Sequence, residues 1–508
     1  MASEPTPQEK RMSMRRAVFL ALVLTLLTAP TWLYPYYARY DSGAYIMGTA
    51  GLAGGEAPRI LSHPLRPPAV YPPVTMVLLT PVYALSGGSD VAMRFMLALL
   101  WLATMVLLAW SWLEDEQRRR WLPWVLLLAG VSSIWLYVGR IQSEIPYLLV
   151  TVAAICCLDR LKRDRRFFGG PWGPAVLALV VLAGLTRQIG LMLAVGGALY
   201  LVWDRARLRR GIALAALVLL VGAAPGVALY SATQPGQFSP QKSSVMRRHG
   251  WEPERGQMSF LSREFAGRVK SNVEVSLQFA SGALFAIDFP PRSRAARVAL
   301  AVLAMLIGVG YLRQWVRGPT AAEFYLLPYL ALLLVTPWLV ETRFYTVLVP
   351  WLALYLLLAI EWLARLLLRN DARARLATRA MAGALFAVAL VLVVQYDFVD
   401  RWSRNENPEA AAYAWASELT GAEEVVLTRD PFAFHVLTGR LAMSYTASEQ
   451  KYQPPYRLPG YLAGGGRLDA VLYPLSEEGE VRQRLAEAGL SMQPPQKLQN
   501  WVFARIEH

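Results

Sequence analysis

Long runs of hydrophobic residues recur along the chain, and short polar stretches separate them. Most of the runs approach the roughly 20 residues that an α-helix needs to cross a bilayer core of about 30 Å. The pattern predicts an all-α polytopic membrane protein with about eleven transmembrane helices. The runs lie at 17–34, 92–113, 121–138, 145–158, 173–186, 188–203, 211–230, 296–312, 323–340, 344–364 and 380–397.

Basic residues gather at every second junction between these runs. Such clusters stay on the cytoplasmic side, so we expect a multi-pass protein of the cell membrane with its N-terminus inside and its C-terminus outside. A basic stretch at 10–16 precedes the first run, which has no clean small-residue cleavage site and is interpreted as an uncleaved anchor. The clusters are Arg118 to Arg120, Arg160 to Arg166, Arg205 to Arg210, Arg313 to Arg317 and Arg365 to Arg379.

One apolar segment, 71–87, does not fit this alternation. Counted as a full span, it would move the Arg118 cluster to the outside. It also contains Pro72, Pro73 and Pro81, and proline interrupts a helix. We therefore predict a re-entrant or interfacial helix on the outer side.

The remaining segments face outward and divide the chain into two domains. A membrane domain, 1–397, carries the outer loops 34–91 and 232–295, and within the second loop 258–286 is expected to form an amphipathic helix on the membrane surface. The tail, 398–508, alternates strands and helices, which predicts a small α/β domain of about a hundred residues. Its expected strands are 424–428, 441–446, 470–473 and 501–506, and its expected helices are 432–438 and 480–488.

Composition supports this picture and excludes several classes of protein. Hydrophobic residues make up 55% of the chain, and the net charge of +15 falls between apolar spans rather than on one soluble face, which argues against nucleic-acid binding. The only cysteines, Cys156 and Cys157, are adjacent, so neither a disulfide framework nor a thiolate metal site is expected. No P-loop, dinucleotide fingerprint, zinc HExxH or G-x-S-x-G motif is present.

Two carboxylates stand at the outer ends of the predicted spans. Asp41 follows the first span in Arg39-Tyr40-Asp41-Ser42-Gly43, and at this depth it can accept a proton from a hydroxyl. An N-cap at the start of the next helix is the simpler role. Glu144 lies at the start of another span, where stabilisation by the helix dipole is the simpler role. Together the two could form an acid/base or metal pair.

Isolated basic residues at outward junctions are the second group of candidates. Arg187 and Arg343 break the positive-inside trend, and an arginine fork fits a phosphate group. Snorkelling by Arg187 and an ion pair between Arg343 and Glu341 are the alternatives. Arg59, His63 and Arg66 add donors in the first outer loop, although a lone histidine is more often structural. In the tail, Asp430 and His435 are interpreted as a turn cap and a packed histidine.

These motifs, in this order and topology, resemble the GT-C fold glycosyltransferases, which use polyprenyl-phosphate sugars. Within this group, the motifs most resemble those of the protein O-mannosyltransferases and of the bacterial aminoarabinose transferases that act on lipid A. The resemblance covers roughly 15–400 of the chain. The motifs are Arg39-Tyr40-Asp41-Ser42-Gly43-Ala44-Tyr45, Leu52-Ala53-Gly54-Gly55, Tyr71-Pro72-Pro73, Gln142-Ser143-Glu144, Leu185-Thr186-Arg187 and Arg343-Phe344-Tyr345 with Pro350.

The resemblance implies roles for individual residues. Asp41 becomes the catalytic carboxylate and Glu144 a second acidic residue, although many members have two adjacent acidic residues where this chain has Asp41-Ser42. The lipid phosphate would be bound by Arg187, Arg343, Tyr345, Arg59, His63 and Arg66. Some relatives use a divalent cation and others do not, so such a cation is a possible cofactor.

The leading hypothesis is therefore an inverting transfer of a sugar from a polyprenyl-phosphate donor to an acceptor outside the membrane, which can be a lipid, a glycan or a protein. A flippase for lipid-linked sugars is a second hypothesis. It predicts charged or broken helices at mid-membrane and often a repeat, neither of which the sequence contains. A membrane scaffold that presents the tail is a third hypothesis, in which Asp41, Glu144 and Arg343 would be freely replaceable.

Overall fold

The computed structural model describes most of the membrane domain and of the tail. The described residues are 41–65, 71–113, 137–164, 170–203, 208–233, 263–284, 293–335, 342–393, 408–445 and 458–507, with single positions between 18 and 29 and at 134. Two predicted spans, 17–34 and 121–138, lie largely outside these residues. Arg66 and Glu341 lie outside them as well.

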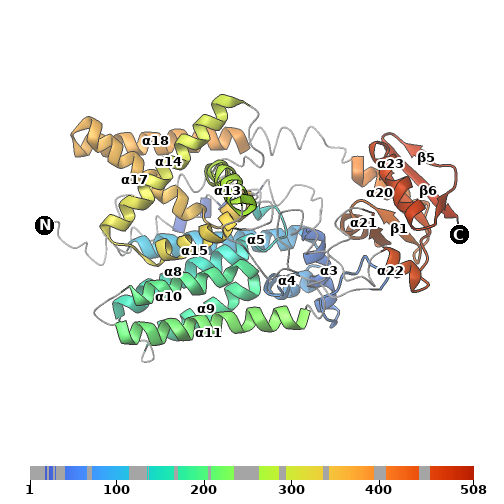
Figure 1. Ribbon diagram of the computed structural model, residues 1–508, viewed down its shortest axis with the longest axis horizontal. Coiled ribbons are helices and arrows are strands. Elements are labelled where there is room, and N and C mark those ends of the chain that lie inside the picture. The colour runs from blue at the N-terminus through green and yellow to red at the C-terminus, as the bar shows by residue number, and fades with distance from the viewer. Residues whose placement is uncertain are drawn as a thin grey trace.

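The hydrophobic runs form a bundle of packed helices (Figure 1). Neighbours in the chain pack against each other in several pairs, such as α8 with α9, α10 with α11, and α17 with α18. The bundle helices are α5 (Asp90–Leu113), α8 (Glu144–Asp164), α9 (Trp172–Thr186), α10 (Leu191–Val202), α11 (Leu208–Thr233), α14 (Arg294–Arg317), α15 (Ala321–Val335), α17 (Val349–Leu368) and α18 (Asp371–Val393).

Apolar helices of membrane length confirm that the chain is a membrane protein. Among the described residues, three helical stretches are long and apolar enough to cross a bilayer: 90–110 of α5, all of α14 and all of α17. Shorter apolar helices, including α9, α10 and α15, belong to the same bundle. The number of eleven spans and the orientation of the termini stay predictions.

Local sequence signals set the ends of these helices. Ser293 caps α14 by accepting a hydrogen bond from the backbone N–H of Ala296 (3.1 Å), and Gly318 follows the helix with a φ of 126°. The expected single helix over 344–364 is divided into α16 (Thr342–Thr346) and α17, because Pro350 is favoured in the first turn of a new helix. The last helix of the bundle, α18, begins at Asp371 rather than at 380. Its first turns are polar, so the pattern of hydrophobic residues did not predict them.

Two short helices, α3 (Asp41–Ala53) and α4 (Val74–Leu85), form an outer layer at one end of the bundle. The expected helix in 71–87 is therefore present as α4, and its 12 residues are too few to cross a bilayer. The expectation that Pro81 interrupts this helix was wrong, because α4 continues through Pro81. Loss of one backbone donor is tolerated where the rest of the helix remains bonded.

The long loop expected at 232–295 contains α13 (Arg263–Gly282), which confirms the helix expected within 258–286. This helix packs against α14, α15 and α16. Its Asn272 Nδ2 donates a hydrogen bond to the backbone carbonyl of Leu334 at 2.9 Å. One face of α13 is thus used for contacts within the protein, and its position at a membrane surface stays a prediction.

The tail is a mixed α/β domain, as predicted. Its sheet has the strand order β2-β1-β3-β6-β4, with β5 also paired to β6. β1 pairs in parallel with β2 and β3, and β3 pairs antiparallel with β6. The elements are α20 (Pro408–Glu418), β1 (Val425–Thr428), α21 (Pro431–Thr438), β2 (Leu441–Ser444), α22 (Leu458–Ala463), β3 (Ala470–Pro474), α23 (Glu478–Glu487), β4 (Ser491–Met492), β5 (Gln496–Leu498) and β6 (Trp501–Glu507).

The tail docks directly on the outer layer of the membrane domain. Phe432 of α21 is buried in one hydrophobic cluster with Ala44 and Tyr45 of α3. The fit leaves no room at Gly43, where an added Cβ would lie 2.6 Å from the Cβ of Phe432. The backbone N–H of Ala442 also donates to the carbonyl of Ser62 at 2.7 Å. The α/β domain therefore holds α3, the helix that begins with Asp41.

Candidate active site

Asp41 lies at the first position of α3. Its Oδ1 accepts a hydrogen bond from the hydroxyl of Tyr71 at 2.7 Å, and its Oδ2 pairs with Arg343 Nη1 at 2.7 Å. The side chains of Asp41 and Arg343 are 19% and 29% exposed. The ion pair joins residues 302 positions apart and leaves both partners accessible from solvent.

A second ion pair lies deeper, between Glu144 at the start of α8 and Arg187. Glu144 Oε1 is 2.5 Å from Arg187 Nη1, and the two side chains are only 3% and 11% exposed. Burial alone lowers the pKa of Arg187, but the charge of Glu144 outweighs this effect and the net pKa is raised. Arg187 therefore stays protonated beside Glu144.

A tight turn places Arg187 beside Glu144. Arg187 ends α9 in an extended conformation, and the short 3₁₀ helix η2 (Gln188–Gly190) follows at once. The N–H of Gly190 donates to the carbonyl of Arg187 at 2.8 Å. A Cβ on Gly190 would lie 2.2 Å from the carbonyl oxygen of Ala183, so only glycine fits there.

Tyr45 connects the two ion pairs. It lies one turn after Asp41 on the same face of α3, and its hydroxyl hydrogen-bonds with Ser143, the neighbour of Glu144. Burial raises the pKa of Tyr45, and the nearby carboxylates of Glu144 and Asp41 add to this increase. The phenol therefore stays protonated and acts as a neutral hydrogen-bonding group.

Phe344 lies between the two arginines. The guanidinium carbon of Arg343 is 5.3 Å from the centroid of its ring, and that of Arg187 is 5.8 Å away. Both distances are within the range of a cation–π contact. The backbone carbonyl of Phe344 accepts a hydrogen bond from the Tyr329 hydroxyl of α15 at 2.8 Å. Two positive charges therefore face one small region of the outer end of the bundle.

Tyrosines line the inner side of this region, and sequence reasoning missed most of them. The hydroxyls of Tyr147 and Tyr325 are 3.0 Å apart, and both residues are fully buried. The hydroxyls of Tyr45, Tyr71 and Tyr329 bond with Ser143, Asp41 and the carbonyl of Phe344. Their spacing within apolar helices gives no sign of a shared site, because the partners come from different helices.

The other predicted phosphate ligands occupy different surroundings. Tyr345 is buried beside Ser276 of α13. Arg59 is exposed. His63 is buried, accepts a hydrogen bond from the N–H of Leu65 at 3.1 Å and lies 6.1 Å from the ring of Tyr461 in the tail. These contacts favour the structural interpretation of His63, at the interface between the two domains.

These contacts bear on the simpler interpretations of several residues. Arg343 pairs with Asp41, and Arg187 is held by Glu144 rather than snorkelling to the surface. In the tail, Asp430 caps α21 by accepting from Ala433 N at 3.1 Å, as expected. His435 Nδ1 lies 2.8 Å from the carbonyl oxygen of Arg440, which fits its expected role as a packed histidine.

The described residues do not contain a group of three or more His, Cys, Asp or Glu side chains arranged to hold a metal ion. Asp41 and Glu144 each have an arginine partner, and a divalent cation would compete with those arginines for the carboxylate oxygens. The donor set of this site therefore does not fit a resident cation.

Comparison with known proteins identifies the fold. The chain is similar to ArnT from Cupriavidus metallidurans in two crystal structures, one bound to undecaprenyl phosphate and one in the apo state. The TM-scores are 0.58 and 0.59, the sequence identity is 14% in both, and each match covers 96% of this chain and 97% of the other. The chain has the GT-C fold.

The GT-C fold confirms the resemblance inferred from the sequence motifs. No protein-family model matches the chain. A search of curated proteins likewise gave no match. At 14% identity the likeness to ArnT shows the fold, and the chemistry must be argued from the residues of this chain.

Proposed function

We propose that the protein is a membrane glycosyltransferase that moves a sugar from a polyprenyl-phosphate donor to an acceptor outside the cytoplasmic membrane. The observation that carries the proposal is the accessible pair of Asp41 and Arg343, which joins a carboxylate and a guanidinium where an apolar bundle meets water. The GT-C fold supports it, because ArnT has this fold and was crystallised with undecaprenyl phosphate.

The two partners of this pair suit the two halves of a transfer reaction. Arginine binds phosphate oxygens through parallel N–H donors, so the donor phosphate competes with Asp41 for Arg343. Exchange of this kind is feasible at a half-exposed pair, since neither partner is left buried without a counter-charge. Binding of the donor thereby frees the carboxylate of Asp41.

The freed carboxylate then acts as a general base. Asp41 takes the proton of the acceptor hydroxyl while the hydroxyl oxygen forms a bond to the anomeric carbon of the sugar. The bond between that carbon and the phosphate oxygen breaks, and the electron pair leaves with the polyprenyl phosphate. Arg343 stabilises the charge that develops on the phosphate. A direct displacement from the opposite face inverts the anomeric centre.

The deeper pair, Glu144 with Arg187, has a positioning and electrostatic role in this proposal. Arg187 adds a second positive charge beside Phe344, near the place where the phosphate would bind. Glu144 Oε2 has no hydrogen-bond partner among the described residues and can accept one from a sugar hydroxyl. Tyr345, Arg59, His63 and Arg66 remain proposed contributors to phosphate binding.

The test is transfer of radiolabel from polyprenyl-phosphate sugars in membranes that contain the wild-type protein or Asp41→Asn. Asp371→Asn is the matched control, because Asp371 also begins a helix and lies 3.5 Å from an arginine, Arg365, at another place in the fold. We expect labelled product with the wild type and the control, and none with Asp41→Asn.

Two other outcomes would overturn parts of the proposal. Full transfer by Asp41→Asn would remove the catalytic assignment and leave the reaction class intact. Label that crosses the membrane on its donor without forming product would point instead to a flippase.

A further inference from the structure

The corner between α17 and α18, residues 361–381, lies at the end of the bundle away from the tail (Figure 1). α17 has 20 residues, or about 30 Å of helix, and it begins shortly after α16, which carries the arginine of the accessible pair. Its last turn therefore lies near the membrane surface opposite the proposed reaction centre. Arg369 then turns the chain with a φ of 50°, and Asn370 caps α18 by accepting from the N–H groups of Ala372 (3.0 Å) and Arg373 (3.1 Å).

Exposed apolar side chains surround this α17–α18 corner. The three leucines that end α17, Leu366 to Leu368, are exposed, and Leu367 is exposed by 77%. Leu376 on α18 is 66% exposed. Earlier on α17, Trp362 is half-buried, and its ring centroid lies 5.5 Å from the guanidinium carbon of Arg313. Tryptophan and arginine together are typical of the boundary between a bilayer and water, so the corner lies at the depth of the lipid head groups.

Positive charge at the corner exceeds negative charge. The two acidic side chains, Glu361 and Asp371, both contact Arg365, at 2.6 Å and 3.5 Å. The side chains of the other four arginines are exposed or half-buried and have no ion pair or hydrogen bond among the described residues. A cluster of this kind at the end of a membrane helix attracts anionic lipid head groups. The four arginines are Arg369, Arg373, Arg375 and Arg379.

Two of these arginines repel each other on α18. Arg375 and Arg379 are four residues apart, so their side chains are neighbours on the helix surface, and like charges at this spacing are unfavourable. At 3.6 residues per turn, Leu376 lies on the same surface between Arg379 and Arg373. An anion bound between Arg375 and Arg379 would remove the repulsion, and an apolar chain attached to this anion would cover Leu376.

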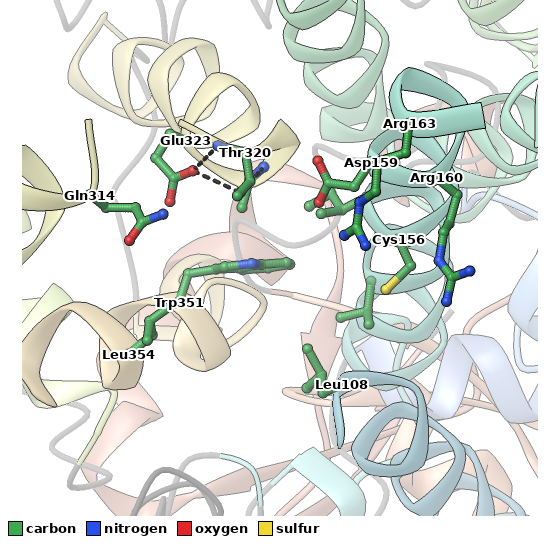
Figure 2. A pocket seen from close by; sticks show the side chains of 13 residues that line it. Leu108, Cys156, Asp159, Arg160, Arg163, Gln314, Thr320, Glu323, Trp351 and Leu354 are labelled. Atoms are coloured by element: carbon green, nitrogen blue, oxygen red, sulfur yellow. Dashed lines mark hydrogen bonds between the residues drawn. The ribbon is translucent and has the colours of Figure 1, made fainter. Parts of the chain in front are cut away.

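The arginines at the end of α8 have different surroundings, although they lie at the same end of the bundle. Figure 2 shows Arg160 and Arg163 beside Asp159, on the α8 side of a hollow that α14, α15 and α17 complete. Arg163 interacts with the charge of Asp159. The guanidinium carbon of Arg160 is 4.4 Å from the ring centroid of Trp110 and 5.6 Å from that of Trp172. These arginines have partners within the protein, so the α17–α18 corner is the stronger site for an external anion.

We propose that the α17–α18 corner binds an anionic phospholipid, such as phosphatidylglycerol, in the leaflet opposite the reaction centre. Its phosphate lies between Arg375 and Arg379, and its acyl chains run along Leu376 and the leucines that end α17. A zwitterionic lipid gains less, because both acidic side chains of the corner are engaged by Arg365 and leave its ammonium without a partner. A free phosphate also gains less, because it lacks the chains that cover the leucines.

Lipid titrations of the purified full-length protein test this proposal. The protein is delipidated in detergent and titrated with short-chain phosphatidylglycerol, with phosphatidylcholine, or with glycerophosphoglycerol, which is the head group without its chains. Native mass spectrometry counts the bound lipid, and the midpoint of thermal unfolding is measured in parallel. We expect phosphatidylglycerol to bind about tenfold more tightly than phosphatidylcholine, and this preference to shrink at high salt. The head group alone should stay unbound.

Substitutions on α18 locate the site. Arg375→Gln/Arg379→Gln should weaken the binding of phosphatidylglycerol by about tenfold to thirtyfold. Leu376→Glu keeps every arginine and supplies a carboxylate three residues from Arg379, so it should compete with the lipid and weaken binding. Leu376→Gln is its neutral control and should retain most of the binding. Arg482→Gln/Arg484→Gln removes the same two charges from α23 of the tail and should bind as the wild type does.

Equal affinity of the wild type for phosphatidylglycerol and phosphatidylcholine would overturn the proposal, and so would undiminished binding by Arg375→Gln/Arg379→Gln. A loss of the same size in Arg482→Gln/Arg484→Gln would overturn it as well, because net charge rather than the corner would then explain the preference. Equal binding of the head group without chains would replace the lipid site with a simple anion site. If the double variant on α18 fails to fold, equal binding by Leu376→Glu and Leu376→Gln is the result that contradicts the proposal.

Discussion

The two ion pairs at the outer end of the bundle have the same chemistry and different surroundings. Asp41 and Arg343 are 19% and 29% exposed, whereas Glu144 and Arg187 are 3% and 11% exposed. A half-exposed pair can exchange partners with a substrate at little cost, while a buried pair cannot lose one member without stranding the other charge. The more exposed pair, Asp41 with Arg343, is therefore the one proposed to react. The buried pair, Glu144 with Arg187, is proposed to maintain the geometry of the site.

The largest effect is expected on removing one member of the buried pair. Glu144→Leu should lower the free energy of unfolding by about 3–5 kcal/mol, because Arg187 is left buried without its counter-charge. The double variant Glu144→Leu/Arg187→Met should recover most of this loss. Thermal unfolding of the purified protein in detergent checks both. Equal losses in the single and double variants would show that the pair is not coupled in this way.

Removing the arginine of the accessible pair should act on the reaction instead. Arg343→Gln is expected to lower kcat by about 10²–10³-fold, as for loss of one group that stabilises developing charge. Its unfolding midpoint should stay close to that of the wild type, since Asp41 remains partly hydrated. Arg482→Gln, on the surface of the tail, provides the control. A normal kcat in Arg343→Gln would remove this arginine from the mechanism.

The position of α3 can be disturbed without touching either pair. Gly43→Ala brings a Cβ to 2.6 Å from the Cβ of Phe432, and overpacking of this kind costs about 1–3 kcal/mol. We expect reduced stability and reduced transfer, because the tail holds the helix that begins with Asp41. The double variant Gly43→Ala/Phe432→Ala relieves the clash and should recover part of both. Unchanged transfer in Gly43→Ala would show that docking of the tail does not position Asp41.

The smallest effect is expected from an ion pair in the tail, which extends the comparison to an exposed site. Glu424 accepts hydrogen bonds from the N–H of Gly421 and from Arg505 Nη1, both at 2.7 Å. Burial alone would raise the pKa of Glu424, but these hydrogen bonds and the charge of Arg505 lower it below its usual value of 4.5.

The sign of the pH dependence follows from that shift. The stabilisation by the pair is present above pH 4.5 and is lost as the pH falls through the lowered pKa of the folded state. We expect a slight drop in the unfolding midpoint of the tail in acid, which Glu424→Gln should lack. Tryptophan fluorescence during thermal unfolding at several pH values checks this. The same acid dependence in Glu424→Gln would assign the effect to other groups.

Hydrophobic periodicity was sufficient for the positions of most helices. The described runs appear as α5, α8, α9, α10, α11, α14, α15 and α17, and the tail strands lie within a residue or two of their expected places. Errors occur where polarity hides a helix, as in the first turns of α18, or where proline divides one, as before α17.

The candidate site was predictable as a set of residue types but not as a set of partners. Asp41, Glu144, Arg187 and Arg343 stood out because charges at the ends of apolar helices are costly. The pairing of Asp41 with Arg343 joins the two ends of the membrane domain, and no local pattern contains that information. The same holds for Phe432, a hydrophobic residue of the tail that completes the cluster around α3.

Exchange of the two charges in the accessible pair gives the most direct test of the account. The variant Asp41→Arg/Arg343→Asp keeps an ion pair at the same place but moves the carboxylate from α3 to α16. Transfer from a polyprenyl-phosphate sugar and the unfolding midpoint are measured on the same preparation. The account predicts a midpoint near that of the wild type and no transfer, because the base and the phosphate ligand have changed places. Transfer restored to the wild-type rate would contradict it and assign the pair a purely structural role.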